Sequence, residues 1–176
     1  MARIPSKIQR RDTYIERIKP FMRTNAVKVM IGHRRVGKSY ILYQLINLIK
    51  EEEKDANIIY INKEDLEFEF IANYRDLYAY VKERLVDEHR NYIFVDEIQE
   101  ITDFRLAIRS LALDENNDIY ITGSNSEMFS SDLANELGGR YVEFKIFSLS
   151  YLECLQFHQL PNDDESLEQY IHSVGL

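Results

Sequence analysis

The sequence holds a single cysteine, Cys154, so no disulfide can form within its 176 residues. One free thiol suits a reducing compartment, and a cytoplasmic location is expected. No apolar run approaches the length that spans a membrane, and the first residues, MARIPSKIQRR, lack the apolar segment of a signal peptide. The four histidines show no metal-ligand spacing. We therefore expect neither a membrane protein nor a histidine-based metal centre.

Short apolar segments alternate with amphipathic ones along the chain. Strands are expected at Ala26–Ile31, Asn57–Asn62, Tyr92–Val95, Ile119–Thr122 and Tyr141–Phe147. One helix is expected to follow Asp12, which would cap it, and a second to begin at Lys38. Further helices are expected over Tyr74–Val86, Phe104–Leu113 and Ser126–Leu137, and after the last strand. This alternation indicates an α/β fold with a parallel sheet covered on both faces. Ligands in such folds bind beyond the carboxyl ends of the strands.

The segment directly after the first expected strand carries the most specific motif. Its residues are Gly32, His33, Arg34, Arg35, Val36, Gly37, Lys38 and Ser39, which fit the phosphate-binding pattern G-x-x-x-x-G-K-[ST]. Glycines let the backbone wrap around a triphosphate, and the helix that begins near Lys38 presents its positive end to the phosphates. In this pattern Lys38 reaches the β- and γ-phosphates, and the Ser39 hydroxyl binds Mg²⁺. Tyr40 completes the expected nucleotide-binding segment, while His33 could touch nucleotide or point to solvent.

A pair of carboxylates follows the third expected strand. The apolar segment Tyr92–Val95 runs directly into Asp96 and Glu97. An aspartate in this position holds Mg²⁺ in phosphate-loop proteins, directly or through water. A second carboxylate beside the γ-phosphate can orient a water molecule and accept its proton, which nucleotide binding alone does not need. Two surface acids at a strand end are the alternative, but the order of motifs favours a catalytic role for Glu97.

Two further polar segments are candidates for the same site. Ser124, Asn125 and Thr122, in that order of preference, lie at the end of the fourth expected strand and could sense the γ-phosphate or position the water. A polar turn that caps the next helix is the alternative, and both could hold. Arg140 follows two glycines and could stabilise the transition-state charge on its own nucleotide or a neighbour's. A surface arginine that closes a helix is the alternative there.

Charge is distributed unevenly along the chain. Residues 1–40 hold eleven Lys/Arg and two Asp/Glu, whereas residues 41–176 hold eleven Lys/Arg and 28 Asp/Glu, for a net charge of −8. A basic segment beside an acidic body can bind polyanions. Three of the eleven basic residues belong to the phosphate-binding loop, however, and the others could form a solvated helix face. Nucleic-acid binding therefore stays open but is not supported by this domain alone.

Several motifs occur in an order that one group of ATPases shares. They are the loop, Asp96-Glu97-Ile98-Gln99, Thr122-Gly123-Ser124, Gly139-Arg140 with Phe144, and Phe147-Ser148-Leu149-Ser150-Tyr151-Leu152-Glu153. On these residues the chain resembles the AAA-type ATPases of the additional-strand, catalytic-glutamate class. More narrowly, it resembles the N-terminal domain of a bacterial and archaeal family of predicted ATPases.

The resemblance implies a three-layer P-loop NTPase fold with a five-stranded parallel sheet in the order 5-1-4-3-2. It also implies ATP rather than GTP as the nucleotide. By this resemblance Lys38 and Ser39 bind phosphate and Mg²⁺, Asp96 binds Mg²⁺, Glu97 activates water, Ser124 is the sensor and Arg140 is the arginine finger. An arginine finger that acts in trans would make the protein a homo-oligomer.

The expected organisation is a helical lead-in at 1–24, an ATPase core at 25–150 and the start of a C-terminal helical region at 151–176. Members of the family continue into a second domain, so we expect one to follow here. The expected function is Mg²⁺-dependent ATP binding and hydrolysis, whose downstream output is not readable from this segment. The alternatives are a nucleotide-gated switch with negligible turnover and a small-molecule phosphotransferase, against which Glu97 argues.

Overall fold

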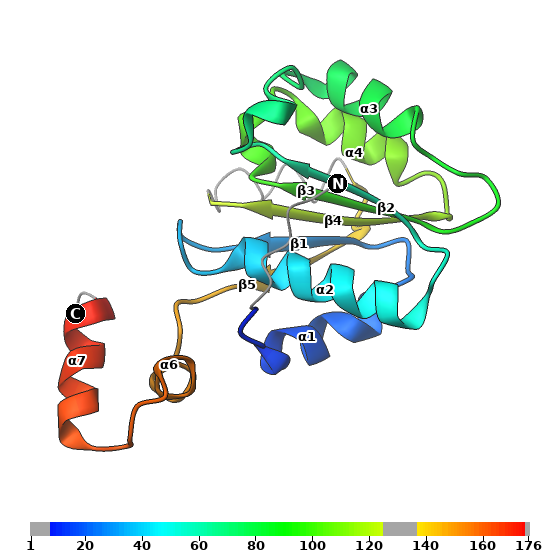
Figure 1. Ribbon diagram of the computed structural model, residues 1–176. Coiled ribbons are helices and arrows are strands. Elements are labelled where there is room, and N and C mark those ends of the chain that lie inside the picture. Colours follow the sequence, from blue (N-terminus) through cyan, green and yellow to red (C-terminus); the bar gives the residue numbers. More distant parts are fainter. Residues whose placement is uncertain (1–7, 125–136, 175–176) are drawn as a thin grey trace.

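The computed structural model describes residues 8–124 and 137–174 of the chain (Figure 1). Its centre is one sheet of five strands: β1 Val27–Ile31, β2 Asn57–Asn62, β3 Asn91–Asp96, β4 Asn117–Gly123 and β5 Tyr141–Lys145. The spatial order is β2-β3-β4-β1-β5, and every pairing is parallel. The predicted α/β class and the predicted strand order 5-1-4-3-2 are therefore confirmed.

Helices cover both faces of the sheet, as Figure 1 shows. The first face carries α1 Asp12–Ile18 and α2 Lys38–Glu52, and the second carries α3 Tyr74–Lys82 and α4 Phe104–Leu111. Successive strand residues point to opposite faces, so each face needs its own apolar set. On β3, Tyr92 and Phe94 join the cluster with α1 and α2, whereas Ile93 and Val95 join the cluster with α3 and α4. Burial on both faces explains why this strand is a continuous apolar run.

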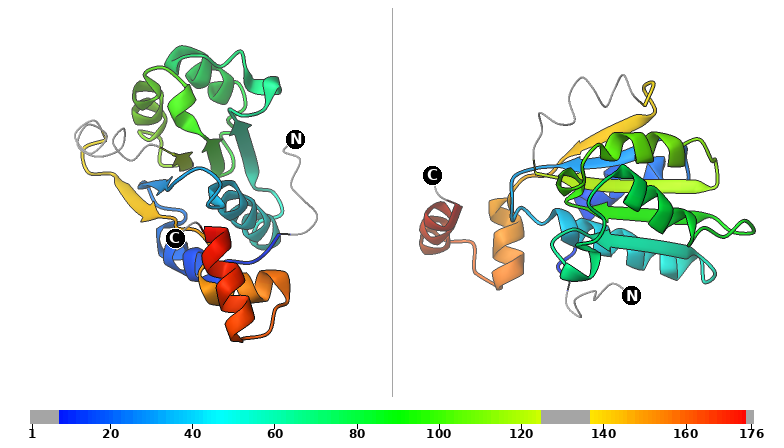
Figure 2. Two further views of the ribbon diagram at one scale, coloured as in Figure 1. Left: turned by 90° about the vertical axis from the view of Figure 1, so that its left-hand side faces the viewer. Right: turned by 90° about the horizontal axis from the view of Figure 1, so that it is seen from above.

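Two helices follow the sheet and lie to one side of it (Figure 2). They are α6 Tyr151–His158 and α7 Asp164–Val174, which pack against each other. Cys154 on α6 is a free, buried thiol. The division of the chain at residues 24 and 150 stays a prediction. In the two ranges that the structure describes, no helix is both long and apolar enough to cross a membrane.

Some element boundaries differ from the sequence-based expectation. Asp12 is the first residue of α1 rather than its cap, and Arg11 holds the cap position. After α1, the chain forms the short 3₁₀ helix η1 Lys19–Phe21, which contains Pro20. Two more 3₁₀ helices are η2 Leu66–Phe68 and η3 Ile98–Glu100. The helix expected over 126–137 lies almost entirely outside the described residues.

Candidate functional site

The polar segments singled out in the sequence meet at one edge of the sheet. Residues 32–39 follow β1. Asp96 ends β3 and Glu97 follows it, and Thr122 lies at the end of β4 with Ser124 just beyond it. These three strands are neighbours in the order β3-β4-β1, and all of them run in the same direction. Their carboxyl ends therefore bring the phosphate-binding loop, the carboxylates and the serine together.

The two loop glycines meet two different steric demands. A Cβ atom on Gly32 would overlap the backbone carbonyl oxygen of Ile146, just beyond β5. The same close approach lets the Ile146 amide donate to the Ile31 carbonyl at 2.7 Å. Gly37 has φ +93°, a backbone conformation that residues with a side chain rarely adopt. It directly precedes α2, so the positive end of that helix opens onto the loop.

Lys38 is the cation at the centre of this edge and is only 3% exposed. Its Nζ donates to the carbonyls of Gly32 at 3.0 Å and His33 at 3.1 Å. The same nitrogen lies 3.2 Å from Oε1 of Glu97 and 3.5 Å from Oγ of Ser124. The lysine thus links the loop to the catalytic candidates. An anionic phosphate at this nitrogen would compete directly with the Glu97 carboxylate.

Glu97 is held through its backbone amide and through its carboxylate. The amide binds the side chain of Thr122, and the carboxylate contacts those of Ser124, Gln99 and Lys38. The φ of Glu97, 53°, is left-handed, and its amide donates to the Thr122 hydroxyl at 2.9 Å. Oε2 accepts hydrogen bonds from Ser124 Oγ at 2.5 Å and Gln99 Nε2 at 2.6 Å. Burial raises the pKa of the Glu97 carboxyl, but the bonds from Ser124 and Gln99 and the charge of Lys38 outweigh burial and lower that pKa below its ordinary value. The group is therefore an ionised carboxylate at neutral pH.

Asp96 is more deeply buried than Glu97, with an exposed fraction of 1%, and its carboxylate accepts hydrogen bonds from hydroxyl groups. It accepts hydrogen bonds from Thr122, from Tyr60 at 3.2 Å and from Ser39. Burial raises the pKa of the Asp96 carboxyl above its ordinary value, although the Thr122 and Ser39 bonds act in the opposite direction. Thr122, the third choice for a sensor, joins the two carboxylates: it donates to Asp96 and accepts from the Glu97 amide.

The oxygen atoms of Ser39 and Asp96 fit Mg²⁺. Both are hard ligands, and the hydroxyl already contacts the carboxylate. Among the residues that the structure describes, no group of three or more His, Cys, Asp or Glu side chains could hold a metal by itself. This donor set suits an ion that completes its shell with water and nucleotide phosphates, as Mg²⁺ does.

The remaining loop residues divide between the surface and the core. The side chains of His33, Arg34 and Arg35 are exposed, and Arg34 lies 3.6 Å from Glu100. Val36 is buried in the cluster with α2, whereas Tyr40 is exposed. Gln99 and Tyr60 contact the two carboxylates and were not predicted. Gln99 could have been found, because it belongs to the D-E-I-Q motif.

Arg140 lies at the opposite end of the sheet from the loop. Its carbonyl accepts from the Val27 amide at 2.9 Å, and Val27 pairs with Tyr141 at the start of both strands. The loop begins after Ile31, about 13 Å further along β1 at about 3.3 Å per residue. Arg140 therefore does not join its own loop. Asn125, the second sensor choice, lies outside the described residues.

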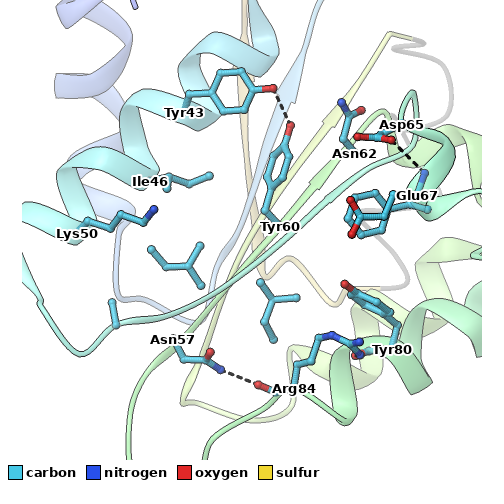
Figure 3. Close-up of a pocket in the computed structure, with 14 residues that line it drawn as sticks. Tyr43, Ile46, Lys50, Asn57, Tyr60, Asn62, Asp65, Glu67, Tyr80 and Arg84 are labelled. Carbon is cyan, nitrogen blue, oxygen red and sulfur yellow. Dashed lines mark hydrogen bonds between the residues drawn. The ribbon is translucent and has the colours of Figure 1, made fainter. Parts of the chain in front are cut away.

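A separate cavity of about 710 Å³ follows the outer edge of β2 (Figure 3). Figure 3 shows Tyr43 and Lys50 from α2 on one side and Tyr80 and Arg84 from the α3 region on the other. Tyr60 lines this cavity and also donates to Asp96. None of the loop residues 32–39 lines it, so the cavity is distinct from the phosphate-binding edge.

The sheet order, the loop after β1 and the carboxylates after β3 together define a P-loop NTPase domain. A family model described as "AAA domain" matches residues 24–155, and the chain belongs to this family. That match covers the sheet, the flanking helices α2, α3 and α4, and the beginning of α6.

Two curated relatives share sequence with most of the chain. An uncharacterized protein of Haemophilus influenzae is 35% identical over 147 residues, which cover 82% of this chain and 37% of the relative. An uncharacterized protein of Methanocaldococcus jannaschii is 36% identical over 152 residues, which cover 86% of this chain and 32% of the relative. The chain thus spans about a third of the length of the curated relatives it matches.

Solved structures share the fold at low sequence identity. ORC1 of Aeropyrum pernix, in complex with DNA, matches with a TM-score of 0.64 and 13% identity, over 94% of this chain and 51% of that chain. AMPPCP-bound DnaA of Aquifex aeolicus matches with a TM-score of 0.53 and 17% identity, over 90% of this chain and 54% of that chain. At these identities the likeness shows the fold alone.

Proposed function

We propose that this domain binds ATP with Mg²⁺ and hydrolyses it to ADP and phosphate. The observation that carries the proposal is the ionised Glu97 carboxylate, held by Ser124 and Gln99 against the loop lysine. A domain that only bound nucleotide would not need a second oriented carboxylate at this place. The family membership and a structural neighbour solved with AMPPCP, an ATP analogue, support ATP as the nucleotide.

Each residue of the edge has a distinct role in the proposed reaction. Lys38 binds the β- and γ-phosphates, and Ser39 and Asp96 hold Mg²⁺. The bound ion would neutralise charge on the phosphate oxygens. Lys38 pairs with Glu97. A phosphate that binds this lysine would draw it away and leave the carboxylate free to accept a proton from water. Ser124 keeps that carboxylate oriented.

The direct test uses the purified chain with ATP and GTP. We expect ATP to bind more tightly, and phosphate to be released only with Mg²⁺ and not after addition of EDTA. Tight binding of ATP without phosphate release, with or without DNA, would instead identify a nucleotide-gated switch. Transfer of a γ-phosphate label to an acceptor other than water would identify a phosphotransferase.

Arg140→Ala tests catalysis between neighbouring copies. Since Arg140 lies at the far end of β1 from its own loop, we propose that it serves the nucleotide of a second copy. The variant should bind ATP normally but release phosphate about 10³-fold more slowly in associated protein, because a charge on the transition state is no longer stabilised. Arg109→Ala, which alters another exposed arginine at the end of α4, is the control and should behave as wild type.

A mixing experiment separates this role from a local defect. Arg140→Ala keeps an intact loop, and Lys38→Ala keeps an intact Arg140. Equimolar mixtures should recover part of the wild-type phosphate release because a mixed pair contains one complete site. Full activity of Arg140→Ala on its own would rule out the finger role.

A further inference from the structure

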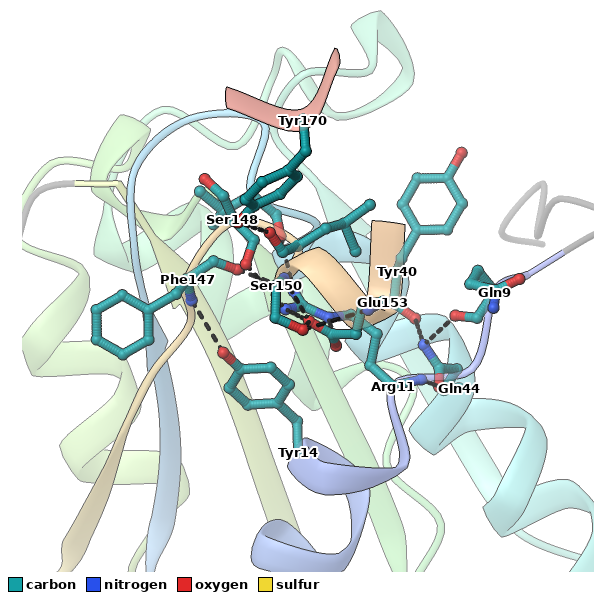
Figure 4. Close-up of polar contacts among 12 residues, drawn as sticks. Gln9, Arg11, Tyr14, Tyr40, Gln44, Phe147, Ser148, Ser150, Glu153 and Tyr170 are labelled. Atoms are coloured by element: carbon teal, nitrogen blue, oxygen red, sulfur yellow. Dashed lines mark hydrogen bonds and ion pairs between the residues drawn. The ribbon is translucent and has the colours of Figure 1, made fainter. Parts of the chain in front are cut away.

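Arg11 is a buried arginine outside the site described so far. It directly precedes α1 and is 4% exposed. As Figure 4 shows, its guanidinium lies among the phosphate-binding loop, the segment after β5 and the start of α6. The guanidinium also lies 4.5 Å from the centre of the Tyr14 ring. In the sequence this residue was one member of a basic segment that could have been solvated.

The loop end of this contact set is the carbonyl of Val36, which accepts from Arg11 Nη1 at 3.0 Å. A trans peptide unit is planar, and its C=O and N–H point in opposite directions. Holding the Val36 carbonyl toward Arg11 therefore turns the N–H of Gly37 away from it, to the other side of the loop. That amide belongs to the G-K-S part of the motif, whose N–H groups bind phosphate.

The other end is the segment that leads into α6. Arg11 donates to the carbonyls of Phe147 at 3.0 Å and Ser148 at 3.3 Å. Its Nε and Nη2 also reach the two oxygens of Glu153, at 2.8 and 3.2 Å. The same carboxylate accepts from the Ser150 amide at 2.8 Å and so caps α6. The Glu153 carboxylate therefore both binds Arg11 and caps α6.

The buried charge of Arg11 links the phosphate-binding loop to the start of α6. A guanidinium is always ionised, and its burial is tolerated only when carboxylate and carbonyl oxygens surround it. Within residues 8–124 and 137–174, the sole carboxylate in contact with it is that of Glu153, while the loop supplies one of the carbonyls. Moving α6 away from the loop would leave a buried cation without its acid, which is costly. The loop and the start of α6 must therefore move together.

We propose that Arg11 is a positioning residue of the phosphate-binding loop and couples nucleotide binding there to the start of α6. The coupling rests on the proposed function, because it needs a nucleotide at the loop. The positioning does not, since it is argued from contacts within the chain alone. In this arrangement a phosphate that orders the Gly37 amide also stabilises the Val36 carbonyl on Arg11, and through Arg11 the capping carboxylate of Glu153.

The test compares Arg11→Gln with wild type by ATP titration and by hydrogen–deuterium exchange. Without nucleotide, the variant should exchange faster in residues 33–38 and 151–158. Its dissociation constant for ATP should rise at least about tenfold, whereas kcat at saturating ATP should fall far less. In wild type, ATP should slow exchange in both segments; in saturated Arg11→Gln it should slow exchange only in the loop. Arg11→Lys should recover part of the affinity without the coupling.

Two further variants separate the proposal from a folding defect. Glu153→Gln keeps an acceptor for the α6 cap but removes the charge, so it should lose the coupling while the helix persists. Arg10→Gln changes the neighbouring residue, whose side chain is 78% exposed, and should match wild type in every measurement. Unchanged exchange of both segments in nucleotide-free Arg11→Gln and Glu153→Gln would overturn the positioning role. Failure of wild type to bind ATP would instead refute the proposed function and leave the nucleotide-free comparison intact.

Discussion

Replacing Glu97 with glutamine should leave ATP bound and slow phosphate release by at least about 100-fold. Glutamine has nearly the same shape, and its carbonyl oxygen can still accept from Ser124 or Gln99. It cannot accept a proton from water at neutral pH, so the proposed base is lost. The variant also loses the ion pair with Lys38, and ATP should therefore bind as tightly as in wild type or more tightly.

Equilibrium titration with a fluorescent ATP analogue and a phosphate-release assay measure the two effects separately. Glu100→Gln is a matched control, because Glu100 ends the 3₁₀ helix η3 that directly follows Glu97, but it is exposed and contacts Arg34 instead. It should retain the wild-type rate. A wild-type rate in Glu97→Gln would show that another group, or water alone, takes the proton.

Replacing Lys38 with alanine should weaken ATP binding by at least about 100-fold, or about 2.8 kcal/mol. The change removes the side chain that bridges the loop carbonyls and the Glu97 carboxylate. It leaves the backbone amides and the helix end, which bind phosphate less strongly without the cation. Phosphate release should disappear at ATP concentrations that saturate wild type.

Lys50→Ala is the appropriate comparison for this variant. Lys50 lies in the last turn of the same helix and is exposed, so its loss should change neither binding nor turnover. Thermal unfolding of both variants should confirm that they are folded. If Lys38→Ala bound ATP with wild-type affinity, the loop would not be the phosphate site.

The sheet could be predicted from the sequence because each strand is short, apolar and followed by an amphipathic helix. The expected strand Asn57–Asn62 and the start of α2 at Lys38 agree with the structure residue for residue. Helix ends were less predictable, since distant side chains decide them. The pattern extends α3 to Val86, but the side chain of Asn91 binds both the amide and the carbonyl of Val86, and the helix ends at Lys82.

Buried charged residues show the limit of local reasoning. Lys28 stands in the middle of β1, where the sequence offers no hint that its amine is fully buried. It pairs with Asp118 on β4, and Tyr120 donates to the same carboxylate at 2.8 Å. Such a pair exists only because the fold places β4 beside β1, 90 residues apart in the chain. Arg11, which is buried, and Glu153, which is half-buried, are a second pair that is far apart in the chain.

The sequence by itself determined the fold class, the strand that carries the loop, and the types of side chain at the candidate site. It could do so because hydrophobic period and a contiguous motif are local properties. Only the tertiary structure decided which of these side chains meet: Ser124 on Glu97, Thr122 on Asp96, and Arg140 away from its own loop. Those contacts depend on strand order and register, which join residues that are far apart in the chain.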